Sequence, residues 1–150
     1  MDETYIKVGG KDRYLYRAVD KQGNTVDFLL TKRRMKGSAQ KFINKAIGNN
    51  GKPRLINIDK SGANTEAFRI INRHSLTFKK IKTRRVKYLN NIVEQDHRTI
   101  KRRIAITTGF KEFESAQRTL AGIEIINIIR KDQLSNSKKS WFATFKSLAA

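Results

Sequence analysis

Three acidic residues stand where the hydrophobic pattern of the chain places the ends of regular elements. Asp59 directly follows the apolar run 55–58, Glu94 opens an amphipathic run after 34 intervening residues, and Asp2 heads the first alternating run. Carboxylate oxygens are the ligands that Mg²⁺ prefers, and two such ions can activate an attacking oxygen and stabilise a leaving one. The three residues therefore suggest divalent-metal and phosphate chemistry.

A cationic helix face accompanies these acids. Lys101 follows Glu94 by seven positions, which is two helical turns on the same face, and His97 and Arg98 lie between them. Such cations could hold the phosphates of a cleaved strand beside the metal ions. Taken alone, however, a charge run is more often a solvated helix face, with ion pairs that each contribute a few tenths of a kcal/mol.

Each acid also has an ordinary interpretation. A single exposed Asp or Glu is usually a surface or capping residue. Asn91 and Glu94 have the spacing of a capping box, which would give Glu94 a purely structural role. The triplet at these positions is much less expected by chance than any one member.

The composition favours a polyanionic partner. The 150 residues include 33 Lys and Arg against 13 Asp and Glu, a formal charge of +20, and neutralising phosphates releases counterions. The absence of cysteine excludes disulfides and thiolate metal sites. No apolar run approaches membrane-spanning length and no signal-peptide pattern is present, so we expect a cytoplasmic protein without membrane or small-molecule partners.

The hydrophobic periods predict the elements that must position these residues. Strands are expected over 5–8, 14–19, 26–30, 54–58 and 78–81, and helices over 39–47, 65–72, 91–106 and 113–130. A meander followed by alternating helices and strands implies a mixed α/β fold, a five-stranded mixed sheet flanked by helices. Residues 132–139 read as a polar linker, and 141–148 as an amphipathic segment that docks back on the domain.

The wording of several segments resembles a known family, the DDE-type transposases of bacterial insertion sequences (the IS-six family). The resemblance covers residues 2 to 131 and includes the spacing between the second and third acids. It is carried by DETYIKV from Asp2, YLYRAVD from Tyr14, DKSGA from Asp59, YLNNIVEQDHR from Tyr88 and RTLAGIE from Arg118.

The resemblance implies a ribonuclease H-like, three-layer fold over 1–131, with 132–150 as an appended segment. It implies Asp2, Asp59 and Glu94 as catalytic metal ligands for two Mg²⁺ or Mn²⁺ ions. The partners implied are double-stranded DNA, as transposon ends and target, and a second copy of the chain in a homodimer. The residues implied to contact DNA are Lys60, His97, Arg98, Lys101 and Arg102.

The chain also departs from the family pattern. The family's helix-turn-helix that binds terminal repeats is not in this sequence, and Met1 alone precedes Asp2, so Asp2 is expected at a fraying strand end. Met35 replaces a capping acid of the family, at a cost of about 1 kcal/mol to the following helix. We therefore expect a truncated, defective transposase catalytic domain. The alternatives are a non-catalytic DNA-binding remnant that interferes with full-length transposase, and a cellular ribonuclease H.

Overall fold

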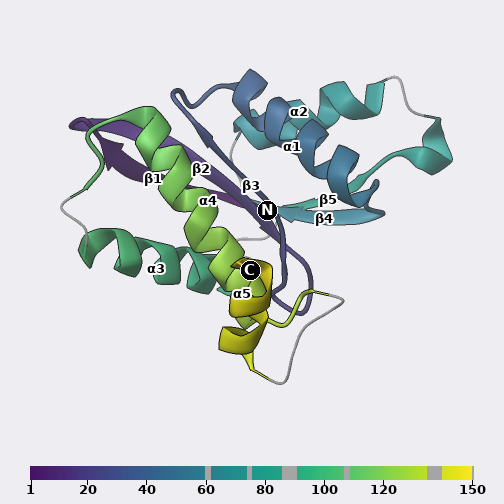
Figure 1. The fold of residues 1–150 in the computed structure, drawn as a ribbon. Helices are drawn as coiled ribbons and strands as arrows, with labels where there is room; N and C mark the ends of the chain where they lie inside the picture. Colours follow the sequence, from purple (N-terminus) through teal and green to yellow (C-terminus); the bar gives the residue numbers. More distant parts are fainter. Residues whose placement is uncertain (60–61, 74–75, 86–90, 107–108, 135–139, 150) are drawn as a thin grey trace.

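The structure is a computed structural model that describes residues 1–150 except 60–61, 74–75, 86–90, 107–108, 135–139 and 150 (Figure 1). The elements follow in the order β1 (Asp2–Val8), β2 (Lys11–Val19), β3 (Thr25–Thr31), α1 (Lys36–Asn50), β4 (Leu55–Ile58), α2 (Gly62–Arg73), η1 (Thr77–Lys79), β5 (Lys82–Arg85), α3 (Asn91–Ile106), α4 (Phe113–Arg130) and α5 (Trp141–Ala149). The predicted mixed α/β class is confirmed.

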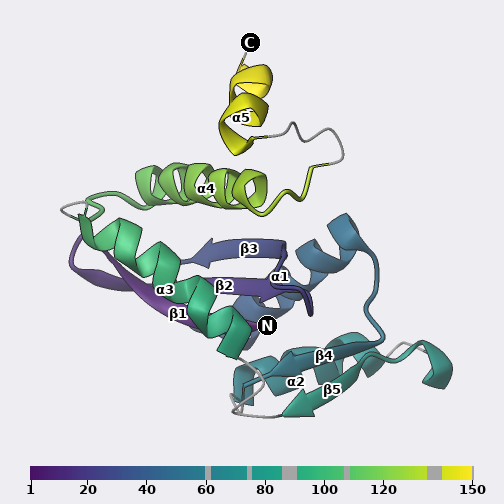
Figure 2. The same ribbon diagram turned by 90° about the horizontal axis from the view of Figure 1, so that it is seen from below.

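Helices cover both faces of a central antiparallel meander, in the order β1-β2-β3 (Figure 2). Side chains alternate along β2 between the two layers. Leu15 packs in one apolar cluster with Ile100 of α3 and Leu120 of α4. Tyr16 packs in a second cluster with Phe42 of α1. This alternation gives the three-layer arrangement expected from the sequence.

The prediction of one five-stranded sheet is wrong. In the described residues the strands form a three-stranded sheet and a separate parallel pair, β4-β5. The start of β1 is joined to β4 by a hydrogen bond, in which the Met1 amino group donates to the Asn57 carbonyl at 2.8 Å.

That same bond corrects the expectation of a frayed first strand. Met1 is 3% exposed and belongs to the apolar cluster that includes Ile58 and Phe68. Burial of the methionine side chain and the bond to Asn57 together hold the start of β1. Asp2 is therefore placed in an ordered strand.

The fifth strand is displaced from its predicted position. Residues 78–81 were expected to form it, whereas Thr77–Lys79 is a short 3-10 helix and the strand runs over Lys82–Arg85. Asn72 accepts from the Ile81 backbone N–H at 2.9 Å and donates to the Ile81 carbonyl at 2.9 Å, which fixes the turn before the strand. Pairing then begins where Lys82 N–H donates to the Arg54 carbonyl at 3.0 Å.

The predicted loss of a helix cap is confirmed. Met35 is the N-cap residue of α1 and, within the described part of the chain, contributes no side-chain capping bond. A neighbouring contact fixes this loop instead, since the Ser38 hydroxyl donates to the Arg33 carbonyl at 2.8 Å. The cap is therefore absent while the turn that leads into α1 is retained.

A buried ion pair joins the sheet to α4. Arg17 Nε donates to Glu124 Oε1 at 2.7 Å, and Arg17 Nη2 donates to Glu124 Oε2 at 2.9 Å. Both side chains are 0% exposed. Because Arg17 pairs with Asp2 across β1 and β2, this contact also supports the strand that carries the first acid.

The C-terminal segment lies beside α4, as the amphipathic pattern predicted (Figure 2). Thr144 is buried, and its hydroxyl donates to the Ser140 carbonyl at 3.1 Å. Within the described residues, no helix combines the length and hydrophobicity that crossing a bilayer requires.

Candidate functional site

The first acid lies on the sheet face that α3 and α4 cover. Ile6 and Val8 of β1 belong to the apolar cluster under those helices. Asp2 shares their parity along the strand, so its side chain is directed to the same face. The alternation of the sequence thus orients Asp2 toward α3, the helix that carries Glu94.

The second acid follows the carboxyl end of β4. Ile58 is fully buried and Asp59 is half-buried at the point where the strand leaves the core. The Asn64 side chain, on the first turn of α2 and 0% exposed, donates from Nδ2 to Asp59 Oδ1 at 2.8 Å. This bond fixes the orientation of one oxygen of Asp59.

The third acid lies on the first turn of α3. Val93, His97 and Ile100 are buried and form the inward stripe of the helix. Glu94 is one residue off that stripe, with its side chain 58% exposed, and it forms a loose ion pair with Arg98 at 3.4 Å. Exposed pairs of this kind contribute little to stability, so the pair leaves the Glu94 carboxylate accessible.

The pKa of Asp2 reports on the other two acids. Burial raises the pKa of Asp2, and the charges of Asp59 and Glu94 raise the same pKa further. Three elements far apart in sequence therefore carry carboxylates whose negative charges repel one another. A divalent cation would relieve that repulsion. The donor chemistry fits Mg²⁺ or Mn²⁺. Among the described residues, however, no three His, Cys, Asp or Glu side chains are grouped closely enough to hold one ion.

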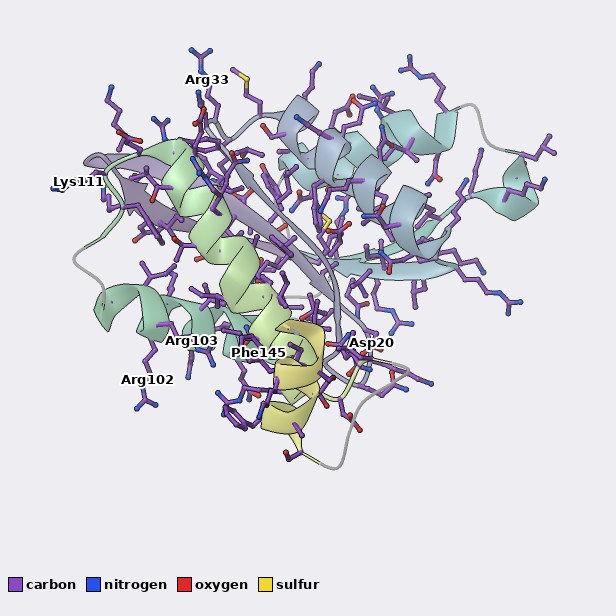
Figure 3. The ribbon with its side chains drawn as sticks, viewed as in Figure 1. Asp20, Arg33, Arg102, Arg103, Lys111 and Phe145 are labelled. Atoms are coloured by element: carbon purple, nitrogen blue, oxygen red, sulfur yellow. The ribbon has the colours of Figure 1, made fainter. Side chains whose placement is uncertain are left out.

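The predicted cations divide into three cases. Arg98, Lys101 and Arg102 are exposed on α3, and the Lys101 Nζ lies 5.1 Å from the centroid of the Tyr5 ring on β1. Figure 3 shows Arg102 directed away from the body of the domain. His97 is only 4% exposed, so its ring faces protein and the predicted DNA contact is not supported. Lys60 lies outside the described residues.

Two polar neighbours of the acids were missed in the sequence. Asn64 occupies the buried stripe of α2 with Ala67 and Phe68, and an amide on an apolar stripe was the available signal. Glu3 forms an ion pair with Arg34; burial raises the pKa of Glu3, and the Arg34 charge opposes that effect. Glu3 thereby ties the loop before α1 to the strand of Asp2.

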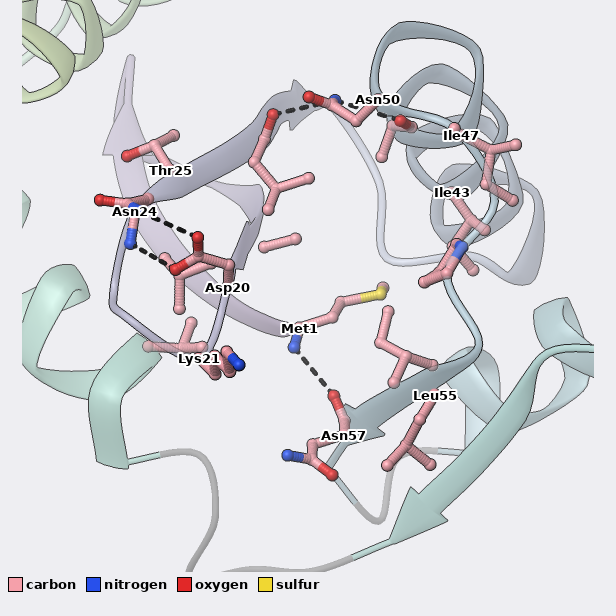
Figure 4. Close-up of a pocket in the computed structure, with 18 of the residues that line it drawn as sticks. Met1, Asp20, Lys21, Asn24, Thr25, Ile43, Ile47, Asn50, Leu55 and Asn57 are labelled. Carbon is pink, nitrogen blue, oxygen red and sulfur yellow. Dashed lines mark hydrogen bonds between the residues drawn. The ribbon is translucent and has the colours of Figure 1, made fainter. Parts of the chain in front are cut away.

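A pocket lies beside the acids and does not contain them (Figure 4). It has a volume of about 780 Å³ and is lined largely by apolar side chains, among them Ile43, Ile47 and Leu55. Met1 lies in it, and burial lowers the pKa of the Met1 amino group to about 6. Among the described residues, Asp2, Asp59 and Glu94 are not part of its lining.

The raised pKa of Asp2 gives a testable consequence for stability. Above the ordinary carboxyl pKa, the unfolded chain loses this proton before the folded one, so stability falls as pH rises toward the folded pKa. Asp2→Asn should therefore stabilise the metal-free protein at pH 7, and the gain should disappear below about pH 4. Urea unfolding in EDTA measures this difference.

The exposed Asp12, in a surface ion pair with Lys7, supplies the matched control. Asp12→Asn should give no gain at pH 7. A loss of stability on Asp2→Asn across the whole pH range would show that Asp2 acts as a structural acid.

Comparison with known proteins gives the family. A family model described as "DDE domain" matches residues 1–133. The transposase for the insertion sequence-like element IS431mec of Staphylococcus aureus is 42% identical over 132 residues, covering 87% of this chain and 57% of the relative. The transposase of IS257 in transposon Tn4003 of the same species gives the same figures. The chain thus spans a little over half the length of the curated relatives it matches.

A solved structure agrees on the fold. A chain of the simian T-cell lymphotropic virus intasome, determined with PP2A regulatory subunit B56 gamma, superposes with a TM-score of 0.62 at 17% identity. The match covers 94% of this chain and 51% of that one, and the shared fold is ribonuclease H-like. With the matched DDE domain and the staphylococcal relatives, this places the chain in the family of DDE transposases of insertion sequences, within the IS-six group.

Proposed function

We propose that residues 1–131 are a transposase catalytic domain that cleaves DNA strands at transposon ends and joins a 3′-hydroxyl to target DNA. Residues 132–150 are a linker and a helix appended to it. The family acts in DNA transposition, and a DDE domain implies dependence on divalent metal. The observation that carries the proposal is the placement of the acids: Asp2 lies on the face of β1 that α3 covers, and the charges of Asp59 and Glu94 raise its pKa.

In this proposal Asp2, Asp59 and Glu94 hold two Mg²⁺ or Mn²⁺ ions. When bound, the ions supply activation of the attacking oxygen and stabilisation of the leaving oxygen in phosphoryl transfer. Asn64 orients Asp59 through the 2.8 Å bond to Oδ1. Lys101 and Arg102, exposed on the helix of Glu94, hold DNA phosphates beside the acids, and two copies of the chain act together on the DNA.

Plasmid nicking tests the proposal. Supercoiled plasmid with Mn²⁺ should be nicked by the wild-type chain, and Glu94→Gln should lower the rate by about 100-fold, since even residues behind metal ligands commonly contribute 10- to 100-fold. Glu114→Gln, on the exposed first turn of α4, is the matched control and should keep the wild-type rate. Equal rates for wild type and Glu94→Gln would remove the catalytic assignment.

A second function has its own supporting observation. The described acids are not grouped to hold an ion, which favours a non-catalytic DNA-binding fragment that competes with full-length transposase. Such a fragment would bind DNA with steep salt dependence and would not nick it. The Asp59→Asn variant would bind DNA as tightly as the wild-type chain. Cleavage of an RNA–DNA hybrid in preference to plasmid would instead favour a ribonuclease H.

A further inference from the structure

A basic surface to which no role has been assigned lies on β5 and the residues beside it. Residues 60–93 hold nine Lys or Arg and a single acid, Glu66. The structure places four of these, together with the neighbouring Arg54, on or beside β5. We call this set the β5 strip, and its members are Arg54, Lys80, Lys82, Arg84 and Arg85.

The strip is built as a surface and not as part of the core. All four side chains of β5 are exposed, while its backbone is held by parallel pairing with β4. Lys82, Arg84 and Arg85 have no ion-pair partner among the residues that the structure describes. The strand therefore presents fixed and unneutralised positive charge.

The register connects the strip to the acids. Arg85 pairs with Ile58, the residue before Asp59, and Lys82 pairs with Leu55 at the other end. Because the strands are parallel, Arg85 lies at the edge where Asp59 leaves the sheet. The three residue steps from Lys82 to Arg85 span about 10 Å, which matches about three steps of one DNA strand at about 3.4 Å of helix axis each.

We propose that the β5 strip binds the phosphate backbone of double-stranded DNA and leads it to Asp59. This inference rests on the proposed function and extends it from Lys60 and the cations of α3 to a further strand. The contacts are to phosphates, so the strip contributes affinity without sequence preference. The competing explanation is that charge on an edge strand prevents sheet-to-sheet association.

Two triple variants separate these explanations. Lys82→Gln/Arg84→Gln/Arg85→Gln removes three charges from the strip. The control, Lys11→Gln/Lys111→Gln/Arg118→Gln, removes three exposed charges from the β1–β2 turn and the start of α4, and Figure 3 shows Lys111 at the opposite end of the molecule from β5. Binding is measured by fluorescence anisotropy with a 30-base-pair duplex in EDTA over a salt series.

The strip variant should bind about tenfold or more weakly than wild type, and the slope of log K against log salt should shrink by about 2 to 3, at about 0.9 per phosphate contact. The control should change the slope by less than about 1. A charge-keeping variant, Arg84→Lys/Arg85→Lys, should retain the wild-type slope. If Lys82→Gln/Arg84→Gln/Arg85→Gln misfolds, the slope of Arg84→Lys/Arg85→Lys still tests the inference. A loss of salt dependence in this charge-keeping variant would contradict simple phosphate contact.

Equal weakening in strip and control variants, or no weakening in either, would overturn the inference. Aggregation of the strip variant with unchanged DNA affinity would assign the charges to edge protection, and tighter binding to a duplex RNA of the same sequence would overturn the DNA assignment. Binding in EDTA needs no metal. Equal nicking rates for wild type and Glu94→Gln would therefore defeat the catalytic proposal while leaving this binding result intact.

Discussion

Glu124→Gln should destabilise the fold by about 3 to 5 kcal/mol. The substitution keeps the shape of the side chain and leaves the Arg17 guanidinium charged at a fully buried position. Two short charge-assisted bonds from Arg17 become weaker neutral contacts. Because a domain of this size has about 5 to 15 kcal/mol of stability, the variant should lose a large share of it. Chemical denaturation followed by circular dichroism measures the loss.

The double substitution Arg17→Met/Glu124→Leu is the informative control. Replacing both charges with apolar groups of similar size removes the uncompensated charge, so most of the lost stability should return. Glu114→Gln, on the exposed start of the same helix, should change stability by less than about 0.5 kcal/mol. If the double variant is as unstable as Glu124→Gln, the pair contributes through its geometry and not through charge compensation.

Asp59→Asn should lower Mn²⁺-dependent nicking by about 100-fold or more while leaving the fold intact. The asparagine keeps an oxygen that can accept from Asn64 Nδ2, so the contact that orders this side chain survives. What is lost is the negative charge beside Asp2. The measurement pairs nicking rates with duplex binding in EDTA, which should be unchanged or slightly tighter.

Asp12→Asn, on the exposed surface of β2, is the matched control and should nick at the wild-type rate. A nicking rate for Asp59→Asn within about twofold of wild type would contradict its assignment as a ligand. A parallel loss of DNA binding would indicate a structural role for Asp59.

Periodicity was informative wherever apolar residues mark one face. The meander, α1, α3 and α4 were all predicted, because each buries a stripe or an alternating face against the core. β5 was misplaced because its four residues include no apolar side chain, and Ile81, the buried residue nearby, belongs to the preceding turn. Backbone pairing with β4 creates this strand, and no local pattern reports such pairing.

The candidate site was likewise predictable only where a local pattern marks its residues. Asp2, Asp59 and Glu94 could be named from their places at element ends and from the resemblance. His97 was predicted on the cationic face because it stands in a run of charged residues, whereas it is buried in the stripe of Val93 and Ile100. The Arg17–Glu124 pair links residues 107 positions apart, and nothing local in either segment indicates that they meet.

The central claim is that Asp2, Asp59 and Glu94 form one metal centre, and Mn²⁺ titration followed by electron paramagnetic resonance tests it most directly. The wild-type chain should remove Mn²⁺ from the free signal with a stoichiometry of about two ions, and Asp59→Asn should weaken that binding by about tenfold or more. Asp12→Asn should bind as wild type does. Equal Mn²⁺ binding by wild type and Asp59→Asn would contradict the claim.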